Sequence, residues 1–212
     1  MWVVTAALLV TTIAAEYIED CPVDSSGKKF ECTLCGTATQ SVTSAAPRGG
    51  SIRICAELGL DLNGNTLTIK QGQKLYGPGL ITGDVVINAK DTSVLDGVHI
   101  TGRLTISNGD CTNTIVRDAT IDGGLVVAPS GKGAVNIDNS VFKNIVRAKH
   151  TSASDEPVAV AIAHASGSIT VECSTNTAVL VQPAAHATFA PSYVNCLRVI
   201  DLGILFNVFG ED

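Results

Sequence analysis

The sequence has few aromatic and few charged residues. Of its 212 residues, 4% are aromatic and 16% are charged, whereas 45% are hydrophobic. A chain so rich in apolar and poor in charged residues does not belong to the disordered class. Its 14 Lys and Arg residues are scattered and the net charge is −6, so it lacks the basic stripe that nucleic-acid binding needs. We therefore expect a folded protein with no nucleic-acid partner.

An apolar run long enough to span a membrane is also missing near the start of the chain. Trp2 to Ala15 contains no charge, but it is shorter than the ~20 residues of a spanning helix. It has the length of a signal-peptide core without the Lys or Arg that normally precedes one. We interpret residues 1–18 as a hydrophobic N-terminal anchor or an uncleaved signal-like segment. Trp2 to Ile18 would then lie at a membrane or pack against another protein.

The cysteines are odd in number and unevenly spaced. There are seven, and neither a second CxxC nor a nearby His accompanies the pair Cys32 and Cys35, so a four-ligand zinc site is not favoured. The alternatives are buried free thiols and disulfides formed in an oxidising compartment, and we favour disulfides. The candidate disulfide residues are Cys21, Cys32, Cys35 and Cys55. We expect residues 19–50 to form a Cys-rich N-terminal cap.

The middle of the chain repeats with a period near 20 residues. Comparable segments end in aliphatic residues spaced by 18, 19, 21 and 19 positions, namely Ile69, Ile87, Ile106, Val127 and Val146. Such a period indicates a solenoid, in which each repeat buries its apolar face only against its neighbours. Leucine-rich repeats share the period but contain a helical segment, whereas these repeats are short alternating strands with no helical spacing.

One position between two short strands of each repeat is always Gly or Asn. Its occupants are Asn65, Gly83, Gly102, Gly123 and Asn144. Both residue types adopt left-handed backbone angles at low cost. We therefore predict a column of sharp turns, with a left-handed residue in every coil.

These repeats, especially LDLNGNTLTI (60–69) followed by VLDGVHITGRLTI (94–106), resemble the pectin-lyase-like right-handed parallel β-helix superfamily. The resemblance is one of architecture. It implies an all-β fold, a single-stranded right-handed parallel β-helix of about five to seven coils. We assign residues 51–212 to this solenoid, with irregular coils at its C-terminal end. The superfamily includes enzymes and inert surface proteins, so the fold leaves the function open.

Candidate sites for chemistry are weak. Asp96, Arg117 and Asp138 fall in one column, which we interpret as a surface salt-bridge stack rather than a catalytic site. Asp118 and Asn139 form a polar step beside it, interpreted as a turn ladder. His99 alternates with apolar neighbours, which predicts an outward, solvated side chain. We assign no catalytic residue, cofactor or metal ligand from the sequence.

We therefore expect a non-enzymatic structural or assembly protein in a membrane-associated or extracytoplasmic location. Its partners would be other proteins of a larger assembly, and a minor capsid component of a membrane-containing virus fits these features. The alternative is a secreted carbohydrate-active or carbohydrate-binding β-helix. Five Phe, three Tyr and one Trp leave few side chains on which sugars could stack.

Overall fold

The computed structural model describes residues 18–20, 31–88, 92–107, 111–128, 133–143, 146–148, 158–165, 170–173, 177–183, 192–194 and 198–201. Side chains are described for Glu19 and for residues 31–88, 92–107, 114–127 and 135–143. The proposed N-terminal anchor, except for the strand residue Ile18, lies outside this part of the chain, as does Cys21.

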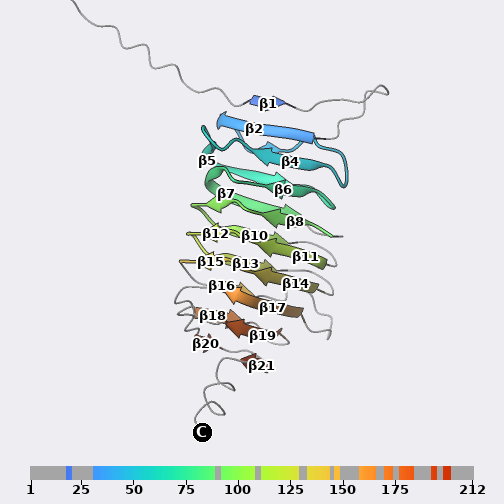
Figure 1. Cartoon of the computed structure of the whole chain (residues 1–212), viewed down its shortest axis with the longest axis vertical. Helices are drawn as coiled ribbons and strands as arrows, with labels where there is room; N and C mark the ends of the chain where they lie inside the picture. The colour runs from blue at the N-terminus through green and yellow to red at the C-terminus, as the bar shows by residue number, and fades with distance from the viewer. Residues whose placement is uncertain are drawn as a thin grey trace, which may run out of the picture.

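The described residues form strands and turns (Figure 1). They contain no helix, and therefore none that is long and apolar enough to cross a membrane. The strands are β1 (Ile18–Asp20), β2 (Glu31–Thr37), β3 (Val42–Thr43), β4 (Ser51–Ile54), β5 (Leu60–Ile69), β6 (Lys74–Tyr76), β7 (Leu80–Asn88), β8 (Val94–Asp96), β9 (His99–Ile100), β10 (Leu104–Ser107), β11 (Cys111–Arg117), β12 (Thr120–Ile121), β13 (Leu125–Ala128), β14 (Gly133–Asp138), β15 (Val141–Phe142), β16 (Val146–Ala148), β17 (Val158–Ala165), β18 (Thr170–Cys173), β19 (Thr177–Pro183), β20 (Ser192–Val194) and β21 (Arg198–Asp201).

Parallel pairing between successive coils produces a β-solenoid. One face is the series β2, β4, β6, β8, β11 and β14, in which each strand pairs in parallel with the next and which covers about five turns. The series continues in parallel through β17, β19 and β21. The sequence-based prediction of an all-β parallel solenoid is therefore confirmed. Figure 1 shows the coils stacked along the long axis of the molecule.

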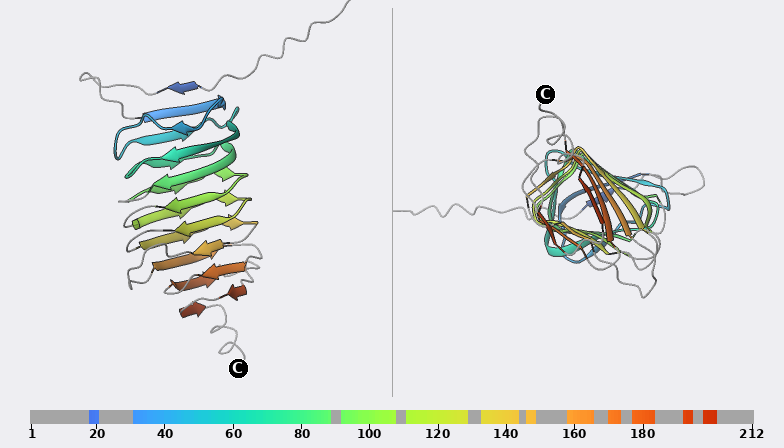
Figure 2. Two further views of the ribbon diagram at one scale, coloured as in Figure 1. Left: turned by 180° about the vertical axis from the view of Figure 1, so that it is seen from behind. Right: turned by 90° about the horizontal axis from the view of Figure 1, so that it is seen from below.

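The other two faces arise because β5 and β7 each bend and serve both of them. Leu60 near the start of β5 pairs with Ile81, and Leu67 near its end pairs with Val85. The first halves of these strands are followed in the stack by β9, β12 and β15. The second halves are followed by β10, β13, β16, β18 and β20. Seen along the axis, the coils superpose in a roughly triangular outline (Figure 2).

Alternating side chains fill the interior with aliphatic residues. Residues at one register position stack through successive coils and are all buried, as in the column Leu60, Ile81, Ile100, Ile121 and Phe142. Fully burying such a side chain stabilises the fold by about 1.5–3 kcal/mol. Among the residues whose side chains are described, this apolar core extends from Cys32 to Phe142.

The N-terminal end is covered by a strand of opposite direction. β1 pairs antiparallel with β2, and Glu19 lies opposite the inward-facing Leu34. The Glu19 carboxylate accepts a hydrogen bond from the Ala45 backbone N–H at 2.6 Å. β1 thus occupies the edge of β2 at Thr33 to Cys35 and leaves these residues no open edge for a further strand.

The boundary predicted between cap and solenoid is too far along the chain. Residues 31–50 were expected in the cap, but Glu31 to Leu34 of β2 pair in parallel with β4, so the first coil begins at Glu31. The alternation of β2 is hard to recognise in the sequence because a cysteine occupies one of its inward positions. Cys32 and Leu34 face inward while their neighbours are partly exposed, which is the alternation of an ordinary coil.

The C-terminal coils pair more regularly than expected. Val158 to Ala163 of β17 pairs residue for residue with Thr177 to Gln182 of β19. Arg198–Asp201 forms the strand β21, which pairs in parallel with β19.

Candidate functional site

Asp96, Arg117 and Asp138, which were predicted to share a column, occupy the same register position in three successive coils. Arg117 is level with Asp96 of the preceding coil and with Asp138 of the following one. Its Nε and Nη2 both donate to Oδ2 of Asp96, at 2.9 and 2.6 Å. The Asp96 carboxylate therefore raises the pKa of Arg117 above its ordinary value. The Arg117 side chain is 51% exposed, so water screens this contact, as it does in other surface ion pairs.

A turn ladder lies beside this column, as predicted. Asn139 Nδ2 donates to Asp118 Oδ1 of the preceding coil. Both residues are left-handed, with φ of 45° and 50°, and Gly97 one coil earlier has φ of 66°. A bonded side chain helps Asn and Asp to hold this conformation. Gly97, Asp118 and Asn139 are thus the column in which successive coils turn through left-handed residues.

The predicted Gly/Asn column is level in the structure, but its physical basis differs from the expected one. Asn65, Gly83, Gly102 and Gly123 each lie two residues before a registered aliphatic position. Only Gly83 among these four has a left-handed φ, of 129°. Asn144 lies outside the described residues.

Close stacking of the backbone explains the glycines at the other positions. A Cβ on Gly102 would lie 2.3 Å from the Gly83 carbonyl oxygen, and one on Gly123 would lie 2.4 Å from the Gly102 carbonyl carbon. The Gly123 N–H donates to the Gly102 carbonyl at 3.0 Å. The left-handed prediction is therefore wrong for Asn65, Gly102 and Gly123. At Gly102 and Gly123, the lack of a Cβ lets the backbone of one coil contact the backbone of the preceding coil.

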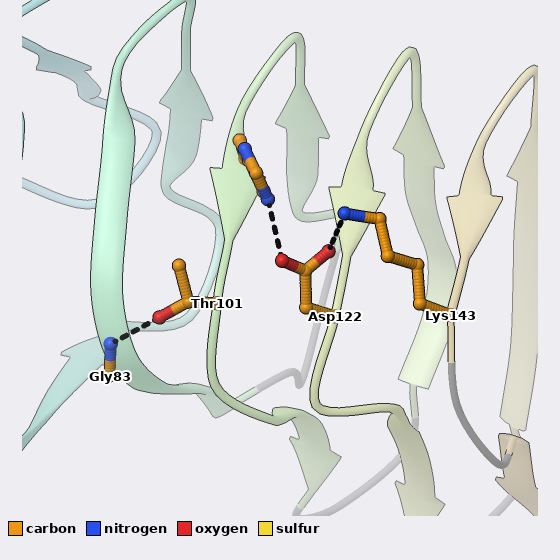
Figure 3. Close-up of polar contacts among 5 residues, drawn as sticks. Gly83, Thr101, Asp122 and Lys143 are labelled. Carbon is orange, nitrogen blue, oxygen red and sulfur yellow. Dashed lines mark hydrogen bonds and ion pairs between the residues drawn. The ribbon is translucent and has the colours of Figure 1, made fainter.

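A second charged cluster is centred on Asp122. Its Oδ2 lies 3.0 Å from His99 Nε2, and its Oδ1 lies 2.9 Å from Lys143 Nζ as an ion pair rather than an aligned hydrogen bond. The three residues come from three successive coils. Figure 3 shows Asp122 and Lys143 in contact, with Thr101 on the neighbouring coil, where its Oγ1 accepts a hydrogen bond from the Gly83 N–H at 3.3 Å.

Two neighbouring groups change the titration of Asp122. The ammonium of Lys143 and then the imidazole of His99 hold the pKa of Asp122 below its ordinary value, against a smaller opposing effect of desolvation. The Asp122 side chain is 28% exposed and that of His99 is 40% exposed. The sequence correctly placed His99 on the outer face, but it gave no sign that Asp122 is its partner.

The period of the repeat could have revealed only part of this cluster. Asp122 and Lys143 are level in successive coils, because their neighbours Ile121 and Phe142 are paired. His99 is level with Thr120 instead, so its contact with Asp122 is diagonal. An alignment of columns does not detect diagonal neighbours, although long side chains can reach them.

Two of the predicted disulfide residues are bonded to each other. Cys35 and Cys55 form a disulfide with a Cα–Cα distance of 5.4 Å. Cys32 is buried and also disulfide-bonded. The Cys35–Cys55 bond joins the first coil to the second and closes a segment with a sequence separation of 20. It therefore cross-links the solenoid itself rather than a separate cap.

The charged clusters described above act between coils. Arg53 Nε lies 3.1 Å from Glu31 Oε1 and adds another contact of this kind, between β4 and β2. Within the described residues, no three His, Cys, Asp or Glu side chains are grouped closely enough to hold a metal ion. The ion pairs described above all join successive coils.

Comparison of the chain with protein-family models, with curated protein sequences and with solved structures found no match.

Proposed function

We propose that this chain is a non-enzymatic structural protein, a stiff β-solenoid that serves as a scaffold in a larger assembly. One observation carries the proposal: its outer polar side chains bond along the stack, from coil to coil. Arg53 with Glu31, Arg117 with Asp96, and Asp122 with both His99 and Lys143 all join neighbouring coils. Side chains used in this way hold the coils in register.

The interior supports the same proposal. Solenoid stability is approximately a sum of coil stabilities and of nearest-neighbour interface terms. Here the interface includes backbone ladders, stacked aliphatic columns, the outer ion pairs and the Cys35–Cys55 disulfide. Bending the rod or separating two coils would disrupt several of these interactions at once, which is a suitable property for a scaffold.

We propose membership of the pectin-lyase-like right-handed parallel β-helix superfamily, supported by the parallel coils and by the strong preference of crossover connections for the right hand. An extracytoplasmic location is supported by the Cys35–Cys55 disulfide, since such bonds persist in oxidising compartments. Trp2 to Ile18 would provide the membrane or protein anchor, and a minor capsid position in a membrane-containing virus is the assembly that we propose.

The test is cross-linking of the full chain in its native particle or envelope, followed by mass spectrometry of the linked peptides. A scaffold predicts repeated cross-links to the same partner proteins at fixed stoichiometry, with lysines such as Lys74 and Lys143 as reporters. A chain recovered as a free monomer, without such cross-links in the intact particle, would contradict the scaffold role.

A carbohydrate-binding function is the second candidate, because one aromatic side chain lies among charges on an outer face. Tyr76 is level with Arg53 on one side and with Asp96 on the other. A partly exposed ring flanked by polar groups is a surface on which a sugar can stack. Binding and depolymerisation assays with acidic polysaccharides, on the wild type and on Tyr76→Ala and Asp138→Ala, separate this function from the scaffold. Saturable binding that is lost with Tyr76 would support it.

A further inference from the structure

Two hydroxyl groups inside the solenoid have no hydrogen-bond partner. Ser93 Oγ and Thr114 Oγ1 are fully shielded from solvent, and neither oxygen is bonded in the structure. Ser140, which is also buried, differs because its hydroxyl donates to the Asp138 carbonyl and accepts from the Ala119 N–H. Leaving a buried hydroxyl unbonded forfeits the hydrogen bonds that water supplied in the unfolded chain.

The two unbonded hydroxyls belong to neighbouring residues in the stack. Val94 is paired with Ile115, so the preceding residues Ser93 and Thr114 are level on adjacent coils, about 4.8 Å apart along the stack. The Ile115 N–H donates to the Ser93 carbonyl at 2.9 Å, which fixes this register.

A buried amide extends this polar group by one coil. Gln73 is level with Ser93, because Lys74 is paired with Val94. Its Nε2 donates to the Ala46 carbonyl, and its Oε1 accepts from the Lys70 N–H at 2.7 Å. The amide nitrogen carries two hydrogens, so it can donate once more. Gln73, Ser93 and Thr114 thus form a short polar column within an aliphatic interior.

We infer that Ser93 and Thr114 bind one buried water molecule, which bridges their hydroxyls inside the solenoid. A buried water needs two to four polar partners and a share of volume of about 30 Å³. Each hydroxyl can donate and accept, and Gln73 provides a further donor. Ser93 has the smallest side chain of the three and lies between Gln73 and Thr114 in the stack. The water joins the coil that contains β8 to the coil that contains β11.

The first test uses the sign of a stability change in the full chain. Ser93→Ala removes one hydroxyl, and Thr114→Val removes the other while preserving the side-chain shape. A bridging water predicts that each variant lowers the folded-to-unfolded ratio about fivefold. The double variant should lose less than the product of the two effects, because the first substitution already releases the water. Urea unfolding followed by circular dichroism measures these ratios.

Thr105→Val is the matched control, since it makes the same change at a half-buried outer position of β10. It corrects for the general effect of replacing Thr by Val in a strand. If Thr114→Val and Ser93→Ala leave stability unchanged or raise it relative to this control, the hydroxyls are unbonded in solution and the inference is wrong.

A direct measurement needs no variant. A high-resolution crystal structure of the full chain should contain an ordered water within hydrogen-bond distance of both oxygens. Nuclear Overhauser effects from a long-lived water to the amide protons of Ser93 and Thr114 would report the same site in solution. Hydroxyls that turn to backbone carbonyls, with no water between them, would overturn the inference.

Discussion

Arg117 and Asp96 are level on adjacent coils, and two guanidinium nitrogens of Arg117 share a single carboxylate oxygen of Asp96. Lys143 and Asp122 are likewise an ion pair between adjacent coils. The outer surface is therefore organised along the axis of the solenoid as well as along the strands.

Removing the charge of Arg117 should have a small effect that depends on salt. Half of this side chain is exposed, and surface ion pairs contribute little to stability because water and ions screen them. We expect Arg117→Gln to shift the urea midpoint slightly at low salt and to match the wild type at 1 M salt. A shift of equal size at both salt concentrations would show that the side chain stabilises the coil by packing instead.

The Asp122 cluster should make stability depend on pH in the acidic range. The pKa of Asp122 is lower in the folded state than its ordinary value of 3.8. The ionised carboxylate therefore adds stability above that ordinary pKa, and this contribution is lost as the pH falls through the folded pKa. Between the wild type and Asp122→Asn, the difference in unfolding free energy should shrink as the pH falls below about 4. A difference that grows as the pH falls below about 4 would contradict the ion pairs.

Substitution of Gly102 should disturb the contact between coils. Alanine places a Cβ 2.3 Å from the Gly83 carbonyl oxygen, so the backbone must move, at a cost of about 1–3 kcal/mol. Gly64 provides the contrast, because its φ is +78° and a Cβ there meets nothing within 4 Å. Gly64→Ala should cost about 1–2 kcal/mol through backbone strain alone.

Asparagine distinguishes the two causes. Asn tolerates left-handed angles, so Gly64→Asn should recover most of the stability lost in Gly64→Ala. Gly102→Asn should be at least as destabilising as Gly102→Ala, because any Cβ clashes there. Thermal unfolding of the four variants tests the distinction, and recovery of stability in Gly102→Asn would refute close stacking as the role of this glycine.

Loss of the Cys35–Cys55 bond should destabilise the first two coils. For a closed segment of this length, the expected cost is about 3 kcal/mol, arising from the greater freedom of the unfolded chain. Cys35→Ser/Cys55→Ser, compared with the oxidised wild type, should show a lower urea midpoint. Hydrogen exchange should locate the increased opening at β2 and β4 rather than at β13 or β14. Equal protection at both ends of the solenoid would contradict a local role.

Much of the fold could be predicted because a solenoid repeats its physical requirements. The aliphatic positions near residues 69, 87 and 106 mark inward columns, and Ile69, Ile87 and Ile106 are indeed paired in register and buried. Arg117 and Asp96 could be placed together for the same reason. Periodicity predicts such contacts because residues one period apart become neighbours.

Other features depend on distances that no period encodes. The Gly83, Gly102 and Gly123 column could be recognised in the sequence, but close backbone contact and left-handed turns both favour glycine. The two causes differ only in the folded structure. The contact between His99 and Asp122 is diagonal, so it depends on side-chain reach. The first coil was missed because its alternation is carried partly by cysteine.

The cover at the N-terminal end gives the rod a polarity. A head-to-tail fibre grows only when each molecule presents two complementary open edges. Here β1 pairs antiparallel with Thr33 to Cys35 of β2, and the Glu19 carboxylate accepts a hydrogen bond from the Ala45 N–H. Another copy cannot pair in parallel with these three residues of β2. The chain thus covers part of one end of its own solenoid, which hinders open-ended polymerisation of a protein made of stackable units.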